Sequence, residues 1–332
     1  MKTCKTTMRT MGKQTTTALQ FFLVFFFSLP AFSSLHKNLK DIQKIRKKII
    51  HVYSPSLKKY RKKTIFRPVN KPPLFDIPVT YNSKVKNWIQ YFQTYARKDF
   101  KIWLERSSKY LPLIKYTLKQ KGLPQDLAYL AMIESGFSSR AVSHASAVGY
   151  WQFIKATAQR YGLKISWWID ERRDFQKSTL AAARYLADLY KMFRSWYLAA
   201  AAYNMGENRL KRLIRKYKTK NFWVLSRKRD FPTETKNYIP KLIAALLIAK
   251  APRLYGFHHI RPHAPYRYEY FYAPGGTDLV NLSRFLGIPY KKIKRLNPEL
   301  IHGFIPKYVS SHRIRIPKGY SKLVSKYVSL KL

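Results

Sequence analysis

The sequence is short of two residue types that many functional sites require, cysteine and the acidic residues. Its single cysteine, Cys4, lies ahead of the apolar segment Phe21–Leu29. We therefore expect no disulfide and no thiolate metal site in the rest of the chain. We also expect no metal ion and no other cofactor.

The shortage of acids leaves a strong positive charge. Lys and Arg total 65, whereas Asp and Glu total 16, so the formal net charge is +49. Such a charge attracts anionic partners, which include nucleic acid, an anionic envelope surface and acidic polymers. It does not choose among them, and a general preference for lysine in the source organism would give the same composition.

Long apolar runs are missing as well. The segment Phe21–Leu29 is shorter than the roughly 20 apolar residues that cross a bilayer. Basic residues precede it, and Pro30 and small residues follow it, an order typical of a secretory signal peptide. We predict a signal peptide over residues 1–33 and an exported protein of the periplasm or cell envelope, membrane-associated if the signal is not cleaved.

Residues 34–83 are predicted to form a basic linker. The run Lys58–Lys63 is followed by three prolines, and a basic, proline-containing composition is typical of a tether. Two interpretations stay open, an arm that binds an anionic surface and a solvated spacer.

Residues 84–257 are predicted to form an all-helical domain, because apolar side chains recur there at three- and four-residue steps. Pro112 is expected to open a helix, since proline fits the first helical turn. Ser178 is expected to cap a helix over about 179–193. Further helices are expected from Trp196 through the alanines at 199–202 and from about Glu234 to Lys250.

Glu134 is the candidate catalytic residue. It shares a helix face with apolar residues three, four, seven and eleven positions earlier. Apolar surroundings disfavour a charged carboxylate and raise its pKa, which allows a general acid to hold a proton near neutral pH. From spacing alone, a structural glutamate paired with an arginine stays an alternative.

Five short blocks begin at Glu134 and follow in order. They are Glu134–Phe137, Ala141–Ser143, Gly149–Phe153, Ala202–Gly206 and Glu234–Tyr238. Over residues 84–257 this set resembles the soluble lytic transglycosylase (SLT) family, and within it the membrane-bound lytic murein transglycosylase D group. Tyr150 and Met205 replace the usual leucine and alanine, which changes the shape of the sugar subsites but removes no polar group.

The resemblance implies a lysozyme-like helical catalytic domain whose partner is the glycan strand of peptidoglycan. By this analogy Glu134 protonates the β-1,4 bond between N-acetylmuramic acid and N-acetylglucosamine, assisted by the muramic 2-acetamido group. Glu134 then acts as a base on the muramic C6 hydroxyl. The product ends in 1,6-anhydromuramic acid, and no water is consumed.

The resemblance also assigns substrate-binding roles by position. Ser143 and Gln152 match residues that orient the acid and the sugar acetamide. Tyr203 and Tyr238 match phenols near the catalytic carboxyl group, and Asn204 matches a contact to sugar or backbone. Taken singly, each of these residues is equally typical of a satisfied buried polar group.

Other functions need different features. A hydrolytic muramidase requires a second carboxylate. Glu207 is the best candidate for it, although a capping role is favoured. The acids at 170, 171 and 174 lie beside arginines and are expected to form surface ion pairs. Retention of Glu134 with its four partner blocks disfavours an inactive peptidoglycan-binding protein. A nucleic-acid partner is not expected, because no nucleic-acid module is recognised.

Residues 265–322 are predicted to form a small α+β module. Alternating tyrosines from Tyr266 to Tyr272 indicate a strand, and Arg313–Pro317 indicates a second one. Two short helices, ending near Leu286 and Leu296, lie between them. This order resembles a degenerate LysM peptidoglycan-binding module. Sugar binding by the module and simple packing against the catalytic domain both stay open.

Overall fold

The computed structural model describes residues 74–265 and 267–330. The predicted signal peptide over residues 1–33 lies outside these residues, and so does most of the predicted linker over residues 34–83. Within the described ranges, no helix combines the length and the apolar character needed to cross a membrane.

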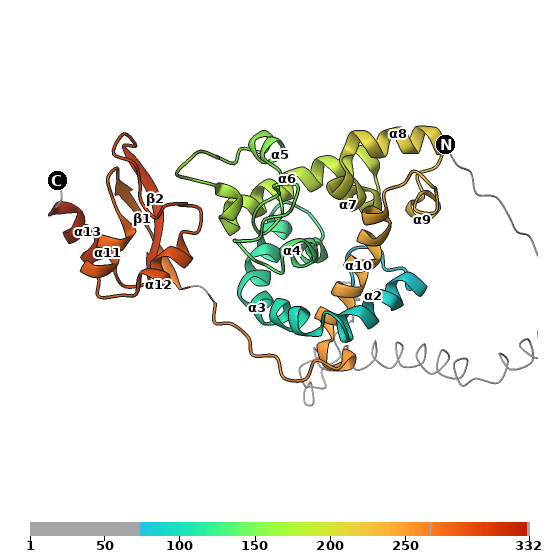
Figure 1. The fold of residues 1–332 in the computed structure, drawn as a ribbon, viewed down its shortest axis with the longest axis horizontal. Coiled ribbons are helices and arrows are strands. Elements are labelled where there is room, and N and C mark those ends of the chain that lie inside the picture. The colour runs from blue at the N-terminus through green and yellow to red at the C-terminus, as the bar shows by residue number, and fades with distance from the viewer. Residues whose placement is uncertain (1–73, 266, 331–332) are drawn as a thin grey trace, which may run out of the picture. The chain divides into compact units, whose positions relative to one another are not determined.

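The larger part of the described chain consists of helices (Figure 1). In chain order, with 3-10 helices written η, they are α2 Ser83–Gln93, α3 Arg97–Gln120, η1 Gln125–Leu127, α4 Ala128–Ser135, α5 Lys155–Arg160, η2 Glu171–Arg173, α6 Phe175–Phe193, α7 Trp196–Met205, α8 Glu207–Tyr217, α9 Phe222–Leu225, α10 Thr233–Lys250 and η3 Pro252–Tyr255. The prediction of a mainly α fold is confirmed.

Helix α4 contacts both α3 and α10 and lies among the helices of the larger part (Figure 1). Its first six residues, 128–133, are all buried. A helix that is apolar on every side is stable only inside a core. The sequence of α4 therefore places the end of this helix, and Glu134 with it, within the helical core.

Helix α7 carries the alanines at 199–202, and all four are buried. It contacts both α6 and α10. Because the distance between packed helices depends on the side chains at the contact, these alanines allow close approach on both sides.

Two predicted helix starts are wrong. Pro112 lies inside α3, where a continuous buried face runs on both sides of it, so packing outweighs the backbone hydrogen bond that proline removes. Helix α6 is capped by Asp174 instead of Ser178. The carboxylate of Asp174 accepts hydrogen bonds of 2.9 Å from the N–H groups two and three residues later.

The C-terminal part is a small α+β unit with a core of its own. Its elements are β1 Tyr268–Pro274, α11 Leu279–Phe285, α12 Tyr290–Leu296, β2 Ser311–Pro317 and α13 Ser321–Ser329. The two strands pair antiparallel, with Tyr268 opposite Pro317. Strand, two helices and strand were predicted in this order, whereas α13, which packs on β1 and α11, was not.

The acids at 170, 171 and 174 were predicted to form ion pairs at the surface, and this prediction is wrong. All three are buried, with exposed fractions of 4%, 3% and 1%. Arg172 lies 2.9 Å from a carboxylate oxygen of Asp170, and Arg315 lies 2.6 Å from one of Asp174. Arg315 comes from β2 of the C-terminal unit. The neighbouring sequence identified the local arginine but not the distant strand that covers these acids.

Candidate active site

Glu134 is held at the end of α4 by a sharp chain reversal at Gly136. This glycine has a φ of +56°, and its N–H donates to the carbonyl oxygen of Met132 at 2.8 Å. A Cβ atom at Gly136 would lie 2.2 Å from the Cδ1 atom of Trp103 on α3. The close approach of the Trp103 ring fixes where α4 ends, and so fixes the position of Glu134.

The carboxyl group of Glu134 accepts a hydrogen bond from the hydroxyl of Tyr238 on α10, at 2.5 Å. The side chain of Glu134 is partly exposed, yet burial of its carboxyl group raises its pKa to about 7. The Tyr238 hydrogen bond and the charge of Lys241 lower this pKa, and the charge of Glu234 raises it. At neutral pH the carboxyl group therefore exists in both protonation states.

Lys241 belongs to this group of residues, although the sequence analysis did not identify it. Its ammonium group donates to the carbonyl oxygen of Ile133 at 3.1 Å, directly beside Glu134. Burial lowers the pKa of Lys241, and the charge of Glu134 acts in the opposite direction. Lys241 follows Tyr238 by three positions on α10 and so shares its face, which is the signal that could have revealed it.

The loop over residues 141–153 packs against the end of α4. The hydroxyl of Ser135 donates to the carbonyl oxygen of Tyr150 at 2.8 Å. Gly149 has a φ of +81°, and a Cβ there would lie 2.0 Å from the carbonyl oxygen of Arg172, so only glycine fits. The loop therefore has one fixed shape beside the acid.

The predicted binding residues Ser143 and Gln152 hydrogen-bond within this loop. The hydroxyl of Ser143 accepts from the N–H of Ala147 at 3.1 Å, and the amide of Gln152 donates to the carbonyl oxygen of Gly149 at 2.9 Å. These bonds stabilise the shape of the loop. Contact with a sugar stays a prediction for both residues.

The predicted residues Tyr203 and Asn204 lie at the end of α7. The Tyr203 hydroxyl donates to the carbonyl oxygen of Trp151 at 2.7 Å. Burial raises its pKa, and the charge of nearby Glu134 adds to the effect. The amide of Asn204 donates to the carboxylate of Glu234 at 2.8 Å. The structure thus brings Glu134, Tyr203 and Tyr238 together, and Asn204 joins α7 to α10 through Glu234.

Glu207, the candidate second carboxylate, is occupied by other groups. It begins α8, pairs with Arg160 at 2.9 Å and accepts a hydrogen bond from Tyr185 at 3.0 Å. Burial raises its pKa, but its own N–H, Arg160 and Tyr185 outweigh burial, so the pKa is lowered. An ionised carboxylate at a helix start fits the favoured capping role. Glu234, whose charge acts on Glu134, is the better candidate for a second carboxylate.

Comparison with protein families gives two matches. Residues 112–226 match the family described as "Transglycosylase SLT domain", and residues 273–329 match "Lytic transglycosylase MltD, LysM-like domain". The predicted resemblance to the SLT family is confirmed. The first match includes Glu134, Tyr203 and Asn204 but ends before Tyr238, so the position of Tyr238 beside the acid comes from the structure.

Curated relatives cover only part of this chain. The membrane-bound lytic murein transglycosylase D of Escherichia coli K12 is 34% identical over 197 residues, which is 58% of this chain and 43% of the relative. A protein of Alteromonas sp. strain M-1, named for tributyltin chloride resistance, is 40% identical over 121 residues, 36% of this chain and 58% of the relative. The chain thus spans less than half the length of the Escherichia coli relative.

Among solved structures, the 70 kDa soluble lytic transglycosylase of Escherichia coli is similar to part of this chain. That structure is 21% identical to this chain, covers 43% of this chain and 24% of its own, and has a TM-score of 0.38.

Proposed function

We propose that this protein is a peptidoglycan lytic transglycosylase in which Glu134 acts first as an acid and then as a base. The supporting observation is the Tyr238–Glu134 hydrogen bond at a carboxyl group whose pKa is raised to about 7. A pKa near the working pH lets one group give a proton and take one back within a single turnover.

In the proposed reaction the protonated Glu134 donates its proton to the glycosidic oxygen between N-acetylmuramic acid and N-acetylglucosamine. The bond from muramic C1 to that oxygen breaks, and the 2-acetamido group of the same sugar stabilises C1. Glu134, now ionised, takes the proton of the muramic C6 hydroxyl, whose oxygen bonds to C1. Internal attack has a large effective concentration, because both groups belong to one bound sugar.

The other predicted residues would support these steps. Ser143 and Gln152 stabilise the loop beside the acid, Tyr203 lies near the Glu134 carboxyl group, and Asn204 orients Glu234. We assign them the substrate-binding roles predicted from the sequence. A site that holds its polar groups in place before the reaction stabilises developing charge more effectively than one that must rearrange.

A hydrolytic muramidase is the second candidate function, and one observation favours it. Glu234 is exposed and close enough for its charge to raise the pKa of Glu134. A carboxylate in that position could orient an attacking water. Its hydrogen bond from Asn204 gives Glu234 a structural partner, which is why we prefer the transglycosylase.

Substitution of the two acids tests this choice. Glu134→Gln keeps an oxygen that can accept the Tyr238 hydrogen bond, so the fold should persist, while cleavage of purified peptidoglycan should fall at least about a hundredfold. Glu234→Gln should lose far less activity. An active Glu134→Gln enzyme would remove Glu134 from the mechanism, and equal losses in both variants would favour hydrolysis with two carboxylates.

We further propose that the chain is exported to the cell envelope. Residues 1–33 would act as its signal, residues 34–83 as a basic linker, residues 84–257 as the catalytic domain and residues 265–322 as a LysM-like module. The composition of residues 1–83 supports export and attraction to an anionic surface. Cell fractionation should find the protein with the envelope, with release that increases with salt concentration. Recovery in the cytoplasm would contradict this proposal.

A further inference from the structure

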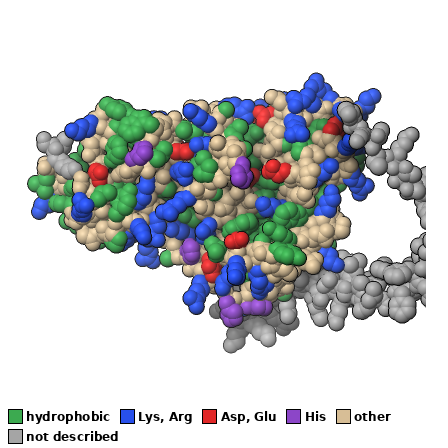
Figure 2. Space-filling view, viewed as in Figure 1, with side chains coloured by type: hydrophobic (Ala, Val, Ile, Leu, Met, Phe, Trp, Pro, Cys, Tyr) green, Lys and Arg blue, Asp and Glu red, His purple; other side chains and the backbone are tan. Residues whose placement is uncertain are grey.

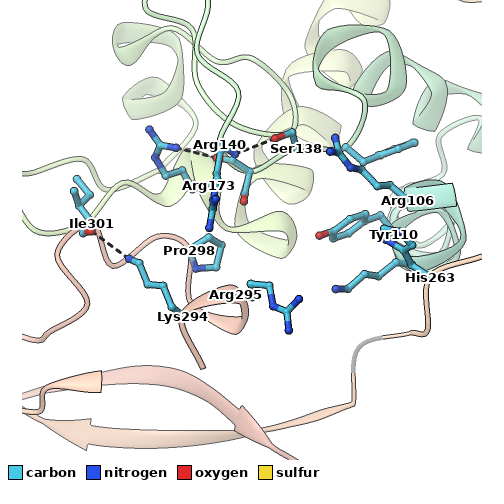
Figure 3. A pocket seen from close by; sticks show the side chains of 13 residues that line it. Arg106, Tyr110, Ser138, Arg140, Arg173, His263, Lys294, Arg295, Pro298 and Ile301 are labelled. Atoms are coloured by element: carbon cyan, nitrogen blue, oxygen red, sulfur yellow. Dashed lines mark hydrogen bonds between the residues drawn. The ribbon is translucent and has the colours of Figure 1, made fainter. Parts of the chain in front are cut away.

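Outside the site of Glu134, the described residues line an open cavity of about 520 Å³, between the helical part and the C-terminal module (Figure 3). Six of its 13 lining residues are basic, and none is acidic. The basic residues are Arg106, Lys109, Arg140, Arg173, Lys294 and Arg295. Figure 2 shows Lys and Arg spread over much of the visible face, but here they line one open cavity.

Both parts of the chain are needed to form this cavity. Arg106 and Lys109 come from α3, whereas Lys294 and Arg295 come from α12 of the module. In Figure 3, Arg106 and Arg295 enter the space from opposite sides. The buried ion pair between Arg315 and Asp174 joins the same two parts, so the walls of the cavity are attached to each other.

Two cations of the cavity, Arg106 and Lys294, donate hydrogen bonds to uncharged protein groups. The guanidinium of Arg106 donates to the carbonyl oxygen of Gly136, and the ammonium of Lys294 donates to that of Ile301. Carbonyl oxygens satisfy hydrogen bonds but carry no full charge. Burial and the charge of Arg295 lower the pKa of Lys109 to about 8, as expected where cations crowd together. Arg173 is partly balanced, since Asp170 lies 3.8 Å away.

The cavity begins next to the proposed active site. Phe137 and Ser138, which line it, follow Glu134 by three and four residues. Three residues of extended chain span at most about 10–11 Å, so Phe137 lies within that distance of Glu134 along the backbone. Tyr110, another lining residue, stacks on Phe137 with ring centroids 6.2 Å apart.

We infer that this cavity binds the carboxylate groups of the peptides carried by the glycan strand that is cleaved at Glu134. The inference rests on the proposed function and specifies its substrate as peptide-bearing strands. Guanidinium groups pair with carboxylates through two parallel hydrogen bonds, which suits the arginines on both walls. A carboxylate tethered to a bound sugar also arrives at a high effective concentration, whereas a separate phosphate polymer does not.

The test measures binding, so that it does not depend on turnover. The full chain with Glu134→Gln binds glycan fragments that carry their peptides and the same fragments after an amidase has removed the peptides. Peptides should tighten Kd by about tenfold, the factor that a single hydrogen bond between charged groups contributes. Lys294→Ala/Arg295→Ala should abolish this preference. Lys291→Ala/Lys292→Ala removes the same charge from the same helix outside the cavity, and should retain it.

Arg140→Ala, on the opposite wall, provides a second variant if the double substitution impairs folding. The inference would be overturned if the cavity and control variants preferred peptide-bearing fragments equally. It would also be overturned if the Glu134→Gln chain without further substitutions showed no preference for these fragments. A third outcome would also overturn the inference. If cavity substitutions weakened binding to anionic phospholipid vesicles while the preference for peptide-bearing fragments persisted, the ligand of the cavity would be phosphate. Failure of the proposed function is seen separately, as absence of cleavage by the enzyme that retains Glu134.

Discussion

At the scale of single residues, opposing effects on one carboxyl group set the chemistry of the site. Burial raises the pKa of Glu134, while the hydroxyl of Tyr238 and the charge of Lys241 lower it. The charge of Glu234 raises this pKa by less than burial does. Tyr203 is near enough for the charge of Glu134 to raise the pKa of its hydroxyl, which donates to Trp151 instead. Burial outweighs the two lowering effects, and the resulting value of about 7 keeps the proton available near neutral pH.

The pH dependence of kcat/KM follows from this balance. The free enzyme must carry the proton on Glu134, so kcat/KM should fall as pH rises through about 7. Tyr238→Phe removes a hydrogen bond that lowers the pKa of Glu134, and the fall should therefore move to higher pH. Tyr203→Phe, whose hydroxyl bonds to Trp151 instead, should leave the position of the fall near that of the parent.

Initial rates on soluble glycan fragments from pH 5 to about 9 would measure both profiles, since that range brackets the raised pKa. A fall that stays in place or moves to lower pH in Tyr238→Phe would contradict the role given to this hydrogen bond.

The sequence predicted part of this site. Glu134 was identified from its helical spacing and block, and Tyr238 from the last block of the resemblance. Lys241 was not predicted, although its spacing from Tyr238 could have indicated it. The electrostatic role of Glu234 was not predicted because it depends on how α10 packs on α4. The side-chain bonds of Ser143 and Gln152 to their own loop depend on a turn geometry that residue spacing does not reveal.

At the scale of elements, the end of α4 determines where the acid lies. Gly136 and Gly122 both have a positive φ, +56° and +67°, and both follow helices. They differ in their surroundings: a Cβ at Gly136 would collide with Trp103, whereas a Cβ at Gly122 would meet nothing within 4 Å. This pair separates backbone strain from crowding.

Gly122→Ala should destabilise the protein by about 1–2 kcal/mol, the cost of a left-handed conformation for a residue with a Cβ. Gly136→Ala should cost about 1–3 kcal/mol more, since overpacking adds to the same strain. Urea unfolding followed by circular dichroism measures both. Equal losses would show that the Trp103 ring moves aside freely, and that it does not fix the end of α4.

Most elements were predicted where local patterns are clear. Helices α7 and α10 and the order of strands and helices in the C-terminal unit agree with the structure. The continuity of α3 through Pro112 was missed because tertiary packing outweighs proline's local effect. Helix α13 was missed although Leu323, Val324, Tyr327 and Val328 recur at helical spacing in the sequence.

At the scale of the whole molecule, a buried ion pair joins the helical part to the C-terminal unit, and no local sequence pattern indicates it. Arg315 lies 2.6 Å from Asp174, which is 141 positions earlier, and 3.3 Å from Glu299. All three side chains are almost fully buried. Removal of one partner from a buried ion pair leaves an uncompensated charge, which costs far more than loss of an exposed pair.

Arg315→Met should therefore destabilise the protein by about 3–5 kcal/mol. Arg313→Met, two residues earlier on β2 and exposed, should cost less than about 1 kcal/mol. Thermal and urea unfolding would compare the two variants. Similar small losses in both would mean that the charged contact contributes little to joining the two parts.

The chemical identity of the cleavage product tests the central claim most directly. A transglycosylase closes the ring between C6 and C1 of the muramic sugar, so its products should be lighter by one water than those of a muramidase and should have no reducing end. Mass spectrometry of digested peptidoglycan, before and after treatment with borohydride, measures both properties. We predict 1,6-anhydromuramic ends that take up no hydride and that disappear with Glu134→Gln. Products with the full mass of added water that are reduced by borohydride would contradict the proposed function, even if Glu134 proved essential.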